Sequence, residues 1–382
     1  MRNQDTTVPK KTPLLVHAGM ATLLLCVATV GYTHHMPDFG RFFAGTNDFL
    51  LFYTQARMVG TGQMYDIKAG YREQERTVGL HLTGAYHDAI ISYRMPWQAL
   101  LMAPLGRLPY PQAYWIWIAL HLVCFAAFVC IWLAPRDCVL WGATFFPLAA
   151  SIIVGQDALL LALCLAGVLR LAERRQDLTA GFLLALCTAK PHLFLLVPLA
   201  LAAHRRWRIV LGAVLGSLVL SILGMAAAGP EWPRRWLTIL TTVGEQSGPD
   251  VATRPSVFQF GMNEATVGIA VALAVAFGVL VWRSRELEAG VAIAVIGSIL
   301  IAPHTHIYDL PLLLVALPAL PLPGHAHWLR IALLTPIPYW ALLSTAPWNA
   351  VLPLMLLAAV GVSACLANPF AARSRAASGL PG

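Results

Sequence analysis

Residues 155–208 read GQDALLLALCLAGVLRLAERRQDLTAGFLLALCTAKPHLFLLVPLALAAHRRWR. Apolar runs alternate with two kinds of turn. The turns "ERRQD" and "HRRWR" are rich in arginine, whereas the turns "GQD" and "KPH" contain none. Pro191 removes a helical hydrogen-bond donor, so it divides the second run into 178–189 and 191–203. As a hairpin, these halves leave both arginine-rich turns on one side of a membrane; a single span would separate them. Lysine and arginine favour cytoplasmic loops, which favours the hairpin.

The composition of the whole chain is that of a membrane protein. Of its 382 residues, 58% are hydrophobic and only 12% are charged, and its mean hydropathy is +0.67. Soluble domains carry about 25% charged residues. Apolar segments that could cross or nearly cross a bilayer recur along the chain. They lie at about 14–33, 110–134, 138–154, 157–172, 178–189, 191–203, 208–228, 265–282, 288–303, 307–321, 327–345 and 349–367.

These segments predict an all-α polytopic membrane protein with about twelve transmembrane helices. Residues 1–370 are expected to form one integral membrane domain, and the small-residue-rich stretch 371–382 a disordered cytoplasmic tail. An even number of spans places both termini on one side, and Arg2, Lys10 and Lys11 before the first span indicate the cytoplasmic side. Two long loops, 34–109 and 229–264, then lie on the extracytoplasmic side, and the first of them is expected to carry amphipathic helices.

Charge, cysteines and motifs exclude several classes of function. The net charge is +8, but the basic residues lie in short loops between apolar runs, which indicates membrane topology and contact with anionic lipids rather than nucleic-acid binding. The seven cysteines form no CxxC pair and are interpreted as packing residues. The sequence contains no Walker loop, GxSxG or HExxH motif, so any chemistry should draw its energy from the substrate.

Asp48 opens the stretch NDFLLFYTQAR, in which Phe49, Phe52, Tyr53 and Ala56 follow at helical spacing. This spacing predicts an amphipathic helix on the membrane or on the spans. Two interpretations of the carboxylate remain open. Asn47 or Asp48 could simply cap the helix, which is the interpretation that spacing alone favours. A carboxylate beside apolar helix faces could instead act as a general base.

The expected topology brings other polar residues to the same face. Lys190 lies between two helical halves, where it could meet a phosphate or merely snorkel to water. Pro303 is followed by His304, His306 and Asp309, whose spacing could suggest a metal site. A role at a phosphate is favoured over a metal site, because the two histidines do not share a helix face. The alternative is that they are merely two histidines in an interfacial turn. Asp157, after Gln156, could merely cap the next helix.

Three stretches together resemble glycosyltransferase family 87, a family of the GT-C class whose members include polyprenol-phosphate-mannose-dependent alpha-mannosyltransferases. They are NDFLLFYTQARMVGTGQMYD at 47–66, YRMPWQALLMAPLGRLPYPQAYWIW at 93–117, and the quoted stretch 155–208, whose Gly-Gln turn, Lys-Pro turn and basic exit resemble those of the family. Two positions depart from the family pattern. Tyr93-Arg94-Met95-Pro96 stands where Tyr-Pro-Pro is usual, and Arg254-Pro255-Ser256 where Asn-Gln-Ser is common.

The resemblance implies an inverting hexosyltransferase with a GT-C-type bundle, acting on a polyprenyl-phosphate sugar, with mannose expected, and on a lipid or glycan acceptor. Asp48, at the matching position, would take the proton of the acceptor hydroxyl. The leaving phosphate would be met by Lys190, His304 and His306. No cofactor or metal is expected, because the leaving group is a single phosphate and no DxD motif lies near Asp48. Further substrate contacts are expected from Tyr53, Tyr93, Arg94, Gln156, Asp157, His192, Arg254 and Asp309.

The expected location is the bacterial inner membrane, with the active site on the extracytoplasmic face. The main alternative is a polytopic transporter or lipid flippase, because transporters also use broken helices. Transporters usually show related halves and ionisable residues near the midplane, neither of which is detectable here. A non-catalytic assembly subunit, in which Asp48 is only a cap, is the second alternative.

Overall fold

The computed structural model describes residues 14–34, 47–79, 94–133, 143–245, 254–344 and 347–367, and within these ranges the chain is helical and contains no strand. Tyr93 lies outside them. The α-helices are α1 Leu14–His34, α3 Phe49–Arg57, α4 Ile67–Val78, α5 Pro96–Gly106, α6 Tyr110–Ile131, α8 Phe146–Val154, α9 Ala158–Glu173, α10 Asp177–Ala185, α11 Val197–Ala203, α12 Trp207–Ala228, α13 Trp232–Glu245, α14 Glu264–Arg283, α15 Leu287–Ile301, α16 Leu313–Ala319, α17 His327–Leu334, α18 Ile337–Leu342 and α19 Val351–Ala367. Short 3-10 helices include η1 Leu186–Ala189, η2 Pro191–Phe194, η4 Val257–Phe260 and η5 Ile307–Leu312.

Four of the described helices, α1, α6, α12 and α14, are long and apolar enough to cross a membrane, and shorter apolar helices accompany them. The all-α character is therefore confirmed for the described residues, and their apolar helices are consistent with a polytopic membrane protein, whereas the expected count of twelve spans is not confirmed. One expected span, 327–345, is two helices, because α17 ends at Leu334 and α18 begins at Ile337. Pro336 and Pro338 at this point lack the donors that a continuous helix needs.

The quoted stretch folds back on itself as the sequence predicts. The chain leaves Asp177 at the start of α10 and reaches Lys190, where Pro191 and two 3-10 turns interrupt the helix. It then returns through α11 to Arg206, whose guanidinium lies 3.2 Å from the Asp177 carboxylate. Lys190 contacts Asp157 at the start of α9, so the polar turns lie at one end of these helices and the arginine-rich turns at the other.

Glycines allow α10 and α12 to approach each other closely. A Cβ added to Gly216 would lie 2.7 Å from the Cβ of Ala185, and one added to Gly212 would collide with the carbonyl oxygen of Leu178. Small residues at such positions let membrane helices pack backbone against backbone. This contact fixes α10, and therefore the Lys190 turn that follows it, against the long apolar helix α12.

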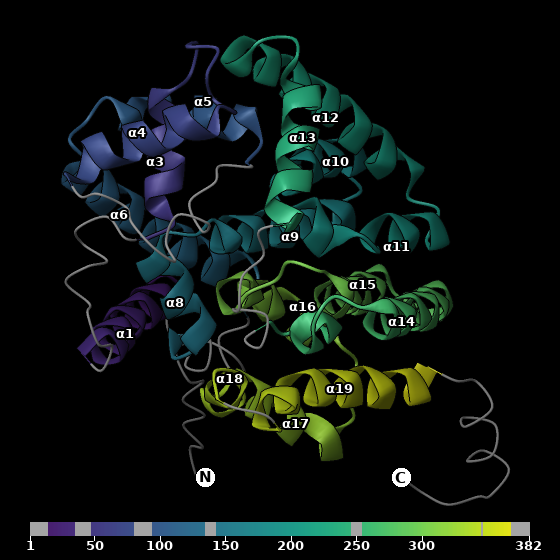
Figure 1. Cartoon of the computed structure of the whole chain (residues 1–382). Helices are drawn as coiled ribbons and strands as arrows, with labels where there is room; N and C mark the ends of the chain where they lie inside the picture. The colour runs from purple at the N-terminus through teal and green to yellow at the C-terminus, as the bar shows by residue number, and fades with distance from the viewer. Residues whose placement is uncertain are drawn as a thin grey trace, which may run out of the picture.

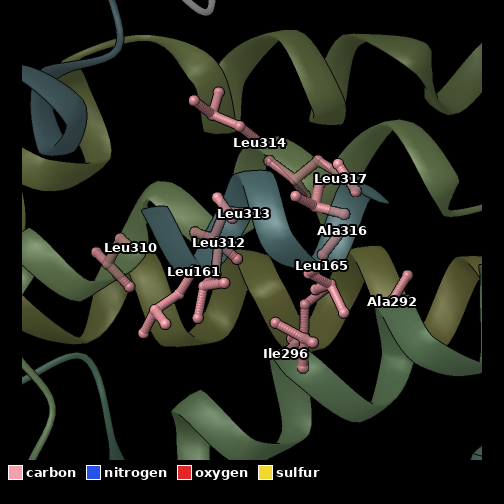
Figure 2. Close-up of a cluster of buried hydrophobic side chains, with 14 of the residues drawn as sticks. Leu161, Leu165, Ala292, Ile296, Leu310, Leu312, Leu313, Leu314, Ala316 and Leu317 are labelled. Carbon is pink, nitrogen blue, oxygen red and sulfur yellow. The ribbon is translucent and has the colours of Figure 1, made fainter. Parts of the chain in front are cut away.

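The helices are arranged in layers (Figure 1), with α14, α15 and α16 between α9–α11 above and α17–α19 below. The core between the upper layers is a run of leucines that begins at Leu310. Figure 2 shows this run packed against Leu161 and Leu165 of α9 and against Ile296 of α15. Because Asp309 directly precedes the run, the buried core anchors that carboxylate in place.

Helix α3 is more deeply buried than an amphipathic helix at a membrane surface. Every residue from Phe49 to Ala56 is buried, because α5 covers one side and α6 another. An aromatic cluster joins α3 to α6, in which the Phe49 ring lies 5.5 Å from that of Tyr114 and 5.9 Å from that of Trp117. The expected helix therefore exists, and it packs on a span as a buried element whose N-terminus, at Asp48, points toward the polar turns.

Candidate active site

The cap of α3 is supplied by Asn47, not by Asp48. The Asn47 side-chain oxygen accepts from the backbone N–H of Leu50 at 3.3 Å and from the Tyr110 hydroxyl at 2.9 Å. The half-buried Asp48 carboxylate makes no capping bond. Instead its Oδ2 accepts a hydrogen bond from Nε2 of Gln156, 108 residues along the chain. The capping interpretation thus applies to the neighbouring asparagine, and the Asp48 carboxylate belongs to a tertiary polar cluster.

The Gly155-Gln156 turn is held rigidly against α3 and α6. Gly155 adopts a φ of 80°, and a Cβ there would lie 2.5 Å from the Cβ of Phe49, so only glycine fits. The Trp117 indole donates to the Gly155 carbonyl at 2.9 Å. The fully buried His121 ring lies between the carbonyls of Trp117 and Gln156, at 2.9 and 2.8 Å. The aromatic face of α6 therefore positions the turn.

Lys190 is the centre of a buried network of charges. Its Nζ lies 3.0 Å from Oδ1 of Asp157, donates to Oδ1 of Asp309 at 2.5 Å, and donates to Oε1 of Gln156 at 2.7 Å. These contacts match the three donors of an ammonium group. The Lys190 side chain is 5% exposed, so it does not snorkel to the surface. A contact between Lys190 and a phosphate requires the exchange of one of these bonds.

A second cation completes the network. Arg94 donates to Oε1 of Gln156 at 2.6 Å, lies 3.5 Å from Asp157, and stacks over the Phe52 ring at 4.7 Å. Gln98, from α5, donates to Oδ2 of Asp157 at 2.9 Å. Asp157 makes no side-chain cap for α9, so the alternative in which Asp157 merely caps that helix does not hold.

The histidine turn lies beside this network. Asp309 accepts from the backbone N–H of His306 at 2.9 Å, which closes the turn before η5. The rings of His304 and His306 are 4.9 Å apart, and that of His192 is 6.4 Å from His304. Burial lowers the pKa of His304 to about 3, so its ring is neutral at neutral pH. The neutral His304 imidazole can donate to an incoming anion without adding charge to the site.

The charge state of Asp48 is set by opposing effects. Burial raises the pKa of its carboxyl, while the bond from Gln156 and the charges of Arg94, His306 and Lys190 lower it, and the pKa remains above its usual range. A carboxylate with a raised pKa is a stronger proton acceptor than an ordinary surface aspartate.

A cavity of about 370 Å³ opens over the network. Its polar wall comes from the Lys190 turn, the histidine turn and Arg254, whose Nη1 donates to the Pro303 carbonyl at 2.8 Å. Its apolar wall includes Trp236 and Leu240 of α13 and the 64%-exposed Met262. The residues lining it are Arg94, Gln156, Ala189, Lys190, Pro191, His192, Trp236, Leu240, Arg254, Met262, Pro303, His304, Tyr308 and Asp309. A cavity with one charged wall and one apolar wall suits an amphipathic ligand.

Most of the described residues predicted for the site therefore lie together in this polar network, although Asp48, Asp157 and His306 do not line the cavity itself. Tyr53 is the exception. Tyr53 is buried in the aromatic cluster, and its hydroxyl donates to the Leu108 carbonyl at 2.6 Å, away from the cavity. Sequence reasoning did not single out Gln98, although a lone glutamine in the apolar helix α5 was a usable signal. Among the described residues, no group of three or more His, Cys, Asp or Glu side chains could hold a metal ion.

Comparison with known families gives one match. The model of glycosyltransferase family 87 matches residues 96–303, more than half of the chain. The chain belongs to glycosyltransferase family 87. Neither curated proteins nor solved structures gave a match. Membership of family 87 implies a membrane glycosyltransferase with a sugar donor and an acceptor. The matched region contains Gln156, the Lys190 turn, the cavity residues of α13, and Arg254, whereas Asp48, Arg94 and His304 lie outside it.

Proposed function

We propose that this protein is an inverting hexosyltransferase that uses a polyprenyl-phosphate sugar, with mannose the first candidate, and transfers the sugar to a lipid or glycan acceptor. The observation that carries the proposal is the position of Asp48, which is linked by Gln156 to the charged wall of an amphipathic cavity. A lipid-linked sugar has matching chemistry, since its phosphate and sugar need polar groups and its tail needs an apolar surface.

In the proposed reaction, Asp48 accepts the proton of an acceptor hydroxyl. The hydroxyl oxygen forms a bond to the anomeric carbon as the bond from that carbon to the phosphate oxygen breaks on the opposite face, which inverts the configuration. The polyprenyl phosphate leaves with the electron pair of the broken bond. Positive charge and N–H donors placed where negative charge develops are usually a large part of catalysis.

The histidine turn and Arg254 are the groups best placed to meet that phosphate. His304 and Arg254 line the cavity, and His306 lies against His304. Lys190 lines the cavity too, but its bonds to Asp157 and Asp309 mean that it contributes chiefly its charge until one bond is exchanged. We expect Arg94 to act in the same way, through the charge that it places beside Gln156.

We further propose that the cavity faces the extracytoplasmic side of a bacterial inner membrane, with both termini in the cytoplasm. The arginine-rich turns support this orientation. Arg206 pairs with Asp177, and Arg170 lies within 3.9 Å of Glu288, both at the end of the bundle opposite to Lys190. Basic residues at one end and the polar cavity at the other agree with cytoplasmic placement of the basic end.

The test uses the purified full chain in lipid vesicles with polyprenyl-phosphate mannose and a panel of lipid acceptors. We expect release of polyprenyl phosphate together with a mannosylated product whose anomeric configuration, measured by NMR, is opposite to that of the donor. Retention of configuration would contradict the single-displacement reaction. Movement of labelled donor between leaflets without any product would favour the transporter alternative instead.

A further inference from the structure

Gln156 bridges the Asp48 carboxylate and the cations of the network. Its Oε1 accepts from Arg94 at 2.6 Å and from Lys190 at 2.7 Å, while its Nε2 donates to Asp48. The two ends of a glutamine amide differ, since oxygen only accepts and nitrogen only donates. Two cations on one side therefore fix which way the amide points, and they direct its N–H toward the carboxylate.

The backbone that carries this amide is equally constrained. Its N–H donates to the Ser151 carbonyl and its carbonyl lies 2.8 Å from Nε2 of His121. Gly155 cannot be replaced without a collision with Phe49, the residue that follows Asp48. The turn and the start of α3 are thus packed against each other, so a side chain at 156 and a side chain at 48 keep a fixed separation.

We propose that Gln156 is a positioning residue, whose amide orients the Asp48 carboxylate and couples it to Arg94 and Lys190, rather than a contact to the sugar. In this arrangement Oε1 is occupied by the two cations and Nε2 is directed at Asp48, which leaves little of the amide for a substrate. The Asp48 oxygen that does not accept from Gln156 is then the one that takes the proton. This role in catalysis rests on the proposed function of Asp48.

The groups that face Asp48 predict how the loss of Gln156 would change the pH dependence of activity. They are Arg94, which precedes α5, Lys190 at the end of η1, and His306 before η5, and each favours the ionised carboxylate. The hydrogen bond from Gln156 favours the same form. Loss of the amide should therefore raise the pKa of Asp48 and move the acidic limb of the activity profile to higher pH, an effect that a merely structural glutamine would not have.

The main variant is Gln156→Met, which keeps the length of the side chain but removes both polar ends. We expect kcat to fall about 10- to 100-fold, as for other small misplacements of a reacting group, with the KM for polyprenyl-phosphate mannose unchanged. The acidic limb of kcat should move to higher pH. The matched control is Gln98→Met, the same change at a buried glutamine that bonds Asp157 and not Asp48; its acidic limb should stay in place.

The proposal would be overturned if Gln156→Met raised the KM for donor or acceptor but left both kcat and the acidic limb of its pH profile unchanged. That result would make Gln156 a substrate contact. Wild-type kinetics for Gln156→Met would overturn it as well. Should that variant not fold, Gln156→Glu carries the test, since it preserves the volume and the acceptors that Arg94 and Lys190 need. It cannot donate to Asp48 when ionised, so its acidic limb should also move to higher pH; an unmoved limb would overturn the proposal.

A second measurement separates this inference from the proposed function. Carbodiimides label protonated buried carboxyls, so the pH at which half of Asp48 is labelled, followed by mass spectrometry, reports its protonation without any turnover. We expect the labelling midpoint to rise in Gln156→Met and in Gln156→Glu and to stay in place in Gln98→Met. An unmoved midpoint would overturn the coupling of Gln156 to Asp48. An Asp48→Asn enzyme that retains turnover would instead refute the base, whatever the midpoint shows.

Discussion

The replacement of Lys190 by methionine tests whether the buried network stabilises the fold. Lys190, Asp157 and Asp309 have side chains only 5%, 4% and 3% exposed, so loss of the ammonium leaves two buried carboxylates. Asp157 keeps Arg94 and Gln98 as partners, whereas Asp309 loses its 2.5 Å ion pair. Removal of one partner of a buried pair costs about 3–5 kcal/mol, because the remaining charge is uncompensated.

The assay is the free energy of unfolding of the purified chain in mixed micelles, measured by SDS titration with tryptophan fluorescence. Lys190→Met should lower it by about 3–5 kcal/mol, and the exposed Lys68→Met in α4 should leave it nearly unchanged. In a double-mutant cycle, Asp309→Asn should restore part of the loss in the Lys190→Met background, with a coupling of about 0.5–3 kcal/mol. Equal stability of the two lysine variants, together with no coupling, would refute the reasoning.

Three further predictions follow from the same geometry. Because burial raises the pKa of Asp48, the acidic limb of kcat/KM should lie at higher pH than an ordinary aspartate gives, with activity lost as pH falls through that pKa; a limb near pH 4 would contradict this. Gly212→Leu should prevent the approach of α10 to α12 and lower the thermal midpoint, whereas Gly268→Leu, at an open position of α14, should not. Trp236→Ala should raise the KM for polyprenyl-phosphate mannose with little change in kcat, and an unchanged KM would remove α13 from the donor site.

The sequence predicted the parts of the fold that depend on charge and proline. The hairpin at Lys190 was predicted because arginines on both sides had to share one membrane face, and the pair of Arg206 with Asp177 confirms the reversal. The number of spans could not be predicted in the same way. Apolar runs of 9 to 17 residues look alike whether they cross a bilayer or fill a core, and Pro336 divides a run that hydropathy alone treats as one.

The polar residues of the site were largely predicted, but their contacts were not. Placing Lys190, Gln156 and Asp309 on one face required only topology, whereas their mutual hydrogen bonds depend on how α9, α10 and η5 pack. Tyr53 was predicted to contact substrate because its spacing matched the family motif. Spacing cannot distinguish a buried aromatic face from one that lines a cavity, and the packing of α3 on α6 decided that question.

Turnover by the Asp48→Asn variant tests the central claim most directly. Asparagine preserves the shape of the side chain and can still contact Gln156, so we expect the variant to insert, fold and bind polyprenyl phosphate as the wild type does. It cannot accept a proton, and loss of a general base typically costs about 10²- to 10⁴-fold in rate. The account predicts that transfer of mannose falls by at least that lower factor. Transfer at close to the wild-type rate would contradict the assignment of Asp48 as the base.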